Sequence, residues 1–197
     1  MSILYRTLAA LFLFSPPLLA GASAPGINNF HQVDQLIYRG AQPTPDGLEY
    51  LAKIGVKTVL DLRENGERSS EEEARVTSLG MHYVNVPMTG LTAPSSAEIT
   101  RILVLMEAPS TGPVFVHCMR GADRTGAVVA AYRIDHDHWD NSRALNEAMS
   151  LGMSFFQLPR QNFIRKFQPL LIMDAPKAAT ASPTKEESNR LPVSIPE

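Results

Sequence analysis

The residues best suited to chemistry lie in the stretch VFVHCMRGADRTG, from Val114 to Gly126, which holds the only cysteine of the chain. Its apolar, β-branched start predicts a buried central strand that ends at Cys118. A glycine-containing turn follows, and a helix is expected to begin near Arg124. The backbone N–H groups of such a turn, together with the positive end of the helix dipole, form a cradle for a tetrahedral oxyanion.

Each residue type in this cradle has a predicted role. The positive field favours the thiolate of Cys118, which is the nucleophilic form of cysteine. The planar guanidinium of Arg124 can hold two oxygens of a phosphate, and the hydroxyl of Thr125 is placed to ease departure of the thiolate. The remaining residues assigned to substrate binding are the rest of the loop and the strand residue before it: His117, Met119, Arg120, Gly121 and Ala122.

His117 and Arg120 have less direct predicted roles. His117 precedes the nucleophile on the strand, so its side chain is expected to point away from the anion and to orient the loop through backbone carbonyls. Arg120 adds a second positive charge to the loop. It is predicted either to reach a further phosphate or acidic group of the substrate, or to be a solvated residue at the rim.

The segments that must position the loop alternate between strand and helix patterns. Thr44 and Pro45 mark one helix start, and Ser95 with Glu98 fits a capping box at another. Strands are predicted within residues 31–40 (a hairpin), 56–63, 81–87 and 113–118. Helices are predicted at 44–55, 69–80, 95–107, 125–135, 142–151 and 160–171. This alternation indicates an α/β domain, in which ligands bind at the carboxyl ends of the strands.

The stretch HCMRGADRTG resembles the signature loop of the cysteine-dependent protein tyrosine phosphatase superfamily: histidine, cysteine, five residues, arginine, then threonine and glycine. In addition, YRGAQPTPDGLEYLAKIGVKTVLDLR looks like the N-terminal half of small dual-specificity-like phosphatases of the atypical bacterial and plant-fungal type. The resemblance covers roughly residues 28–167. It implies a protein tyrosine phosphatase-like fold, with a central, mostly parallel sheet flanked by helices. It also implies phosphoryl transfer to Cys118 and hydrolysis of the phosphocysteine by water, without metal or cofactor.

The general acid departs from the common pattern of this superfamily. The loop that usually supplies an aspartate is VPMTGLTAPSS here, and it contains neither aspartate nor glutamate. The likeness to bacterial and lipid-like phosphatases that carry DRTG implies that Asp123 takes this role. A bound phosphate and the thiolate nearby favour the protonated form of its carboxyl. The alternative is that Asp123 only pairs with an arginine or caps the following helix.

Other charged residues invite simpler interpretations. Arg39 and Arg63 follow strand-like runs and are expected either at the cleft mouth or in surface ion pairs. Asp61 is expected to be a structural hydrogen-bonding residue. His136 and His138 are two apart, which does not match the helical spacing of zinc ligands, so no metal site is predicted there.

Composition and charge place limits on the protein as a whole. The chain has 197 residues, a net charge of −2 and 44% hydrophobic residues, which predict one domain and give no case for nucleic-acid binding. Residues 1–24 read as a signal peptide, although an uncleaved membrane anchor is the alternative. Residues 28–172 are the predicted phosphatase domain, and residues 174–197 are predicted to be a disordered tail. We expect an exported protein, periplasmic or secreted, that is monomeric and has no membrane span after signal removal.

The predicted activity is hydrolysis of phosphate monoesters, with phosphotyrosine and also phosphoserine or phosphothreonine in proteins as candidate substrates. Phosphoinositides or inositol phosphates are the first alternative, because cleft depth and rim residues decide between them. A sulfurtransferase-like carrier and an inactive phosphate-binding module are alternatives from another class. The sequence therefore predicts the reaction centre more closely than the substrate.

Overall fold

The computed structural model describes residues 24–65 and 67–170. Apart from Ala24, the predicted signal peptide lies outside these residues, as does the whole predicted tail at 174–197. No helix in the two described ranges is long and apolar enough to cross a membrane.

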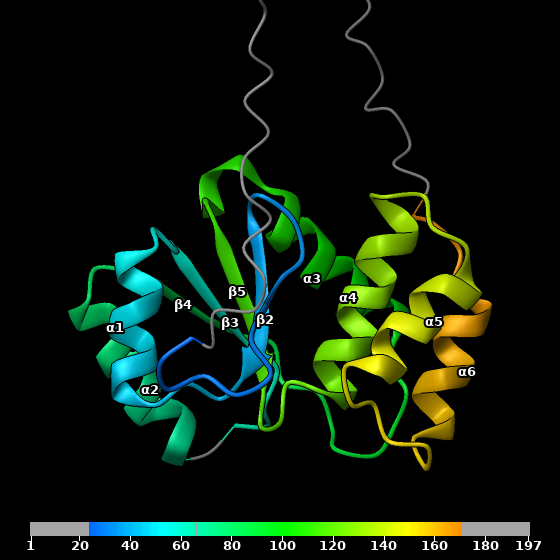
Figure 1. Ribbon diagram of the computed structural model, residues 1–197, viewed down its shortest axis with the longest axis horizontal. Helices are drawn as coiled ribbons and strands as arrows, with labels where there is room; N and C mark the ends of the chain where they lie inside the picture. Colours follow the sequence, from blue (N-terminus) through cyan, green and yellow to red (C-terminus); the bar gives the residue numbers. More distant parts are fainter. Residues whose placement is uncertain (1–23, 66, 171–197) are drawn as a thin grey trace, which may run out of the picture.

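Five strands form one sheet in the order β1-β2-β5-β3-β4. These are β1 (His31–Gln32), β2 (Ile37–Ala41), β3 (Thr58–Asp61), β4 (His82–Asn85) and β5 (Val114–Cys118). Only β1 pairs antiparallel, with β2, as the predicted hairpin requires, and all other pairs are parallel. Every residue of β5 is buried. The predicted central, mostly parallel sheet is therefore confirmed, and its parallel strands end at one common edge, the lower edge in Figure 1.

Six helices cover the two faces of this sheet (Figure 1). On one face lie α1 (Pro45–Lys53) and α2 (Glu67–Ser78). On the other lie α3 (Ser96–Glu107), α4 (Asp123–Asp135), α5 (Asn141–Ser150) and α6 (Leu158–Lys166). A short 3-10 turn, Pro109–Thr111, precedes β5. All six predicted helices are present. Three of them, α2, α4 and α6, begin two residues earlier than predicted, and α6 ends at Lys166 rather than at residue 171.

The alternation of side chains along β5 directs its last two residues to opposite faces of the sheet. Val114, Val116 and Cys118 belong to the core shared with α3 to α6, whereas Phe115 packs on the α1 and α2 side. By the same alternation, His117 faces α2 and Cys118 faces α4. The strand thus presents the cysteine to one helix layer and the histidine to the other.

The packed part of the chain starts before the predicted boundary at residue 28. Ala24 and Ile27 are buried in the core on the α1 side. The carbonyl of Gly26 accepts a hydrogen bond of 2.9 Å from the N–H of Thr44, which is the residue that caps α1. This segment holds α1 against the sheet, so it belongs to the domain.

Replacement of Ser95 by alanine tests the capping box of α3. The Ser95 hydroxyl accepts from the Glu98 N–H at 3.2 Å, and the Glu98 carboxylate accepts from the Ser95 N–H at 2.7 Å. Because an N-cap serine contributes about 1 kcal/mol, we expect the free energy of unfolding in urea to fall by about that amount. Ser96→Ala, at the neighbouring exposed position, is the control and should change it by less than about 0.5 kcal/mol. Equal effects of the two substitutions would contradict the capping role.

Candidate active site

The loop after β5 is fixed in shape by close backbone contacts. Gly121 has a φ of +65°, and a Cβ at this position would lie 2.3 Å from the carbonyl carbon of Gly40. Both the left-handed conformation and the close approach require glycine. The Gly121 carbonyl oxygen accepts hydrogen bonds from Arg39 Nη2 at 2.6 Å and from Asn29 Nδ2 at 3.0 Å. The loop is thereby held in place before any substrate binds.

Cys118 lies at the bottom of this loop and is only 2% exposed. Burial works against ionisation of the thiol. Hydrogen bonds from the hydroxyl and the backbone N–H of Thr125, the charge of Arg124 and the backbone N–H of Arg120 outweigh it, so the pKa of Cys118 is lowered. A lowered pKa enriches the thiolate, as the predicted nucleophile requires.

Arg124 is oriented by two carbonyl oxygens from neighbouring segments. Its Nη1 lies 3.4 Å from the Leu62 oxygen, just after β3, and 3.3 Å from the Met88 oxygen, in the loop that follows β4. These contacts involve one end of the guanidinium. They hold the fork beside the cradle, where its other donors can meet phosphate oxygens.

Behind the loop, four charged or titratable side chains form a buried network: Asp61, Arg63, Glu72 and His117. Arg63 Nη2 donates to Asp61 Oδ2 at 2.7 Å and to Glu72 Oε2 at 2.6 Å. His117 Nε2 lies 2.8 Å from Glu72 Oε1, and its Nδ1 lies 3.4 Å from the Cys118 carbonyl oxygen. His117 therefore supports the loop from the α2 side, away from the anion.

The charges of this network balance when His117 is protonated, since two carboxylates then face two cations. Burial opposes the charged imidazole, but contact with Glu72 and the charge of Asp61 raise the pKa of His117 above its usual value. Burial likewise opposes the Asp61 carboxylate, but the hydrogen bonds from Arg63 and Tyr83 lower the pKa of Asp61. Asp61 is thus structural, as expected.

Asp61, Glu72 and His117 also form the one group of three possible metal ligands among the described residues. Arg63, however, already donates to both carboxylates of this group. A metal ion would have to displace a buried cation there, so these residues fit an arginine better than a metal.

Both carboxylate oxygens of Asp123 have donors. One accepts from the side chain of Arg120, and the other accepts from the backbone N–H of Ser154 at 2.7 Å. The pairing with an arginine that the alternative requires is therefore present, whereas the residue at the N-cap of α4 is Ala122. Asp123 ties the signature loop to the segment between α5 and α6.

Arg160, on α6, holds the loop between β4 and α3. It is completely buried and donates to the carbonyl oxygens of Gly90, at 2.8 Å, and Thr89. Gln157 Nε2 adds a hydrogen bond of 3.3 Å to the Gly90 oxygen. The signature loop, the β4–α3 loop and the α5–α6 segment therefore meet at the carboxyl edge of the sheet.

Sequence reasoning misplaced or missed several of these supporting residues. Arg39 and Arg63 were expected at the cleft mouth or the surface, but both are buried and bind the loop or the network behind it. Glu72 lies in a run of three glutamates that gave no sign of burial. Asn29 and Arg160 act through side-chain contacts to distant carbonyls, which no local pattern reveals.

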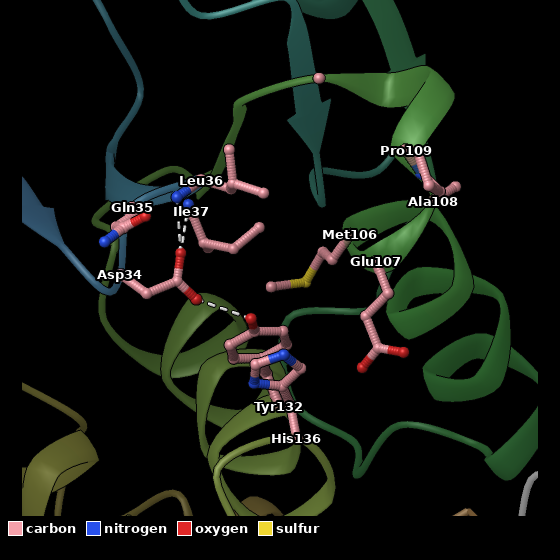
Figure 2. A pocket seen from close by; sticks show the side chains of 11 residues that line it. Asp34, Gln35, Leu36, Ile37, Met106, Glu107, Ala108, Pro109, Tyr132 and His136 are labelled. Carbon is pink, nitrogen blue, oxygen red and sulfur yellow. Dashed lines mark hydrogen bonds between the residues drawn. The ribbon is translucent and has the colours of Figure 1, made fainter.

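A cavity of about 680 Å³ lies at the opposite end of the sheet from Cys118. Figure 2 shows its lining, which includes Asp34, Met106, Tyr132 and His136. The Asp34 carboxylate accepts from the N–H groups of residues 36 and 37 and from the Tyr132 hydroxyl at 2.6 Å. None of the lining residues belongs to the signature loop, so this cavity is separate from the candidate active site.

Replacement of Thr125 by valine tests the support of the thiolate. Valine has nearly the same shape but lacks the hydroxyl that favours the ionised sulfur, so the pKa of Cys118 should rise. Because Cys118 is the only cysteine, the pH dependence of its alkylation by iodoacetamide reports this pKa directly. Thr125→Ser keeps the hydroxyl and should leave the midpoint near that of the unmodified protein. A valine variant with an unchanged midpoint would contradict the assignment.

Replacement of Glu72 by glutamine tests the charge balance behind the loop. The pKa of His117 is higher in the folded protein than its usual value of 6.5. Protonation of His117 therefore stabilises the fold, fully at pH values below 6.5, and this stabilisation is lost as the pH rises through the pKa of the folded state. The difference in unfolding free energy between the unmodified protein and Glu72→Gln should therefore be largest near pH 6 and become smaller as the pH rises. Urea unfolding between pH 6 and 9 measures it. Glu71→Gln, at an exposed neighbour, should show no such trend, and a pH-independent loss in Glu72→Gln would refute the coupling.

The family model PTP-NADK, described as a DSP-PTPase phosphatase fused to NAD+ kinase, matches residues 23–166. The dual specificity protein phosphatase TpbA of Pseudomonas aeruginosa is 34% identical over 139 residues. That alignment covers 69% of this chain and 60% of TpbA, so the chain spans about 60% of the length of this relative.

Two solved structures share the fold of this chain. The core catalytic domain of the PP-IP phosphatase SIW14 from S. cerevisiae, in complex with citrate, has a TM-score of 0.64 and 25% identity. It covers 72% of this chain and 86% of that one. A P. aeruginosa TpbA variant in complex with phosphotyrosine has a TM-score of 0.62 and 23% identity, over 74% and 92% of the two chains. Because the family match extends over both the sheet and the cysteine loop, the chain belongs to this DSP-PTPase phosphatase family.

Proposed function

We propose that the protein is a metal-independent phosphatase that removes phosphate from phosphotyrosine in proteins. The observation that carries the proposal is the buried Cys118, whose pKa is lowered inside a loop bordered by the Arg124 fork. A thiolate beside bidentate phosphate donors is suited to attack on phosphorus. Membership of the DSP-PTPase family supports the same reaction.

The reaction follows two displacements at phosphorus. The Cys118 sulfur forms a bond to phosphorus while the ester P–O bond breaks, and the leaving oxygen takes a proton. Water then attacks the phosphocysteine, gives up a proton, and releases inorganic phosphate and the thiolate. Donation from Thr125 stabilises this departing thiolate, and Arg124 stabilises the charge on the equatorial oxygens in both steps.

Asp123 is our candidate for the group that protonates the leaving oxygen. In the free protein its carboxylate accepts from the side chain of Arg120. A bound dianionic phosphate competes for Arg120, and the carboxylate then loses its counter-charge beside new negative charge. Both changes favour the protonated carboxyl that a general acid needs.

Phosphotyrosine is favoured over inositol phosphates by the residues around the cradle. The three surrounding segments, residues 86–95, 118–124 and 151–160, contain no lysine. Of their three arginines, Arg160 is buried against loop carbonyls, and Arg120 is in an ion pair with Asp123 that a bound phosphate has to break. A highly phosphorylated inositol would need several free cations at this rim. The buried position of Cys118 also suits the long phenolic stem of phosphotyrosine. Structural similarity to SIW14, a PP-IP phosphatase, keeps inositol phosphates as the second candidate.

We further propose that the protein is exported. Support comes from the sequence of residues 1–24, which combines an early arginine, a short apolar run and small residues. Fractionation of cells that produce the full chain tests this: a shortened protein in the periplasm or medium is expected, and full-length protein in the cytoplasm would contradict it.

Replacement of Cys118 by serine tests the proposed reaction. The unmodified protein should hydrolyse p-nitrophenyl phosphate and phosphotyrosine peptides in the presence of EDTA and be inhibited by vanadate, whereas Cys118→Ser should reduce turnover to background. An inositol polyphosphate assayed alongside should give a lower kcat/KM than the peptide. Cyanide-labile sulfur on Cys118 would indicate a sulfur carrier, and phosphate binding without turnover would indicate a binding module.

Replacement of Asp123 by asparagine tests the general acid. Turnover should fall most for alkyl or poorly activated phenyl phosphates, and little for p-nitrophenyl phosphate, whose leaving group needs no proton. Arg120→Met is the control, because it removes the ion pair and leaves the carboxyl. If Asp123→Asn lowered turnover equally on both types of substrate, and Arg120→Met did the same, the role of Asp123 would be the ion pair with Arg120 alone.

A further inference from the structure

Large apolar side chains gather at the rim of the candidate active site. Among the described residues, four exposed ones lie on the segments that border the signature loop. They are Leu91 (77% exposed), Phe155 (72%), Phe156 (87%) and Leu158 (54%), and we refer to them as the apolar rim. Two exposed phenyl rings beside the signature loop add to an apolar patch, and such patches mark interaction sites.

The apolar rim is attached to the catalytic loop by hydrogen bonds. Ser154, next to Phe155, donates its N–H to Asp123, and Gln157 donates to the carbonyl of Gly90, next to Leu91. In Figure 1 the α5–α6 segment and the β4–α3 loop lie at the same edge of the sheet as the signature loop. The rim therefore continues the surface on which the substrate must lie.

The two phenylalanines are held in a defined arrangement. Their ring centroids are 5.8 Å apart, and the rings meet edge to face at an angle of 80°. The buried side chain of Gln161 donates to the carbonyl oxygens of Ser154, at 3.1 Å, and Phe155, at 3.0 Å. Because the backbone beneath the rings is fixed, little conformational entropy is lost when a ligand covers them.

The cradle of the signature loop and the apolar rim together define the chemistry of the ligand that covers them. The cradle requires a phosphate monoester, and the rim offers apolar surface without a lysine in the bordering segments. An anionic membrane surface would be met by several exposed cations, whereas apolar peptide side chains need none. The combination fits a peptide that carries phosphotyrosine beside apolar residues.

We propose that the apolar rim binds the apolar side chains that flank the phosphotyrosine of a protein substrate, and that Phe155 and Phe156 determine this specificity. The inference rests on the proposed phosphotyrosine phosphatase activity. The phosphotyrosine enters the cradle, and the neighbouring residues of the peptide cover the phenyl rings. The rim residues take no part in the chemical steps.

The test compares two phosphotyrosine peptides of equal length, one with leucine and isoleucine beside the phosphotyrosine and one with serine there. The unmodified protein should prefer the apolar peptide by about tenfold in kcat/KM, which corresponds to about 1.4 kcal/mol of apolar contact. Phe155→Ala with Phe156→Ala should reduce this preference to about twofold, mainly through KM, and leave p-nitrophenyl phosphate turnover within about twofold. Val104→Ala, at a 60% exposed apolar position on α3, is the matched control and should keep the preference.

The outcomes separate this inference from the proposed function. If the unmodified protein hydrolysed none of these substrates, the phosphatase assignment itself would be overturned. Normal turnover of p-nitrophenyl phosphate with no peptide preference, or with a preference that survives the double substitution, would overturn the inference alone. The inference would also be overturned if the two peptides were hydrolysed equally well and vesicles that contain a phosphoinositide were hydrolysed faster only when Phe155 and Phe156 are present. That result would assign the apolar rim to membrane binding.

Discussion

A cysteine whose pKa is lowered although it is almost out of contact with water is the constraint on which the rest of this domain depends. Charge at the 2% exposed Cys118 is unfavourable unless donors surround it. The stabilising groups come from Thr125, Arg124 and Arg120, which lie within seven residues of Cys118 along the chain. They converge on it because Gly121 bends the loop back to the start of α4. The sharp turn, the position of the helix and the reactivity of the cysteine are therefore one structural arrangement.

The same constraint explains the charges buried on the other face of the sheet. Asp61 and His117 occupy partner positions on β3 and β5, so the register of the parallel sheet brings them together. Glu72 from α2 and Arg63 complete a group whose charges cancel when the imidazole is protonated. Fully paired charges make a rigid buried network, whereas a missing member would leave a charge uncompensated. The network thus fixes the strand end that presents the cysteine, and it couples α2 to the site.

Much of the fold and the reaction centre could be predicted from sequence because both depend on local patterns. Thr44 and Ser95 mark their helices through contacts three residues away, and the signature loop is contiguous. The supporting residues could not be predicted in this way. Arg39 reaches a carbonyl 82 positions away, and Arg160 reaches one 70 positions away. An arginine after a strand has the same pattern whether it ends in solvent or beneath a loop, since only the tertiary arrangement decides its burial.

Asp123 joins the signature loop to the segment that carries the apolar rim. One carboxylate oxygen accepts from Arg120 of the signature loop, and the other accepts from the backbone N–H of Ser154, directly before Phe155. The β4–α3 loop contains no acidic residue, so in the proposed reaction the candidate acid lies on the signature loop itself. A phosphate bound in that loop competes with Asp123 for Arg120, while the Ser154 N–H keeps the other carboxylate oxygen in place. The proposed proton donor and the side chains proposed to contact the peptide are thus held by the same contact between loop and segment.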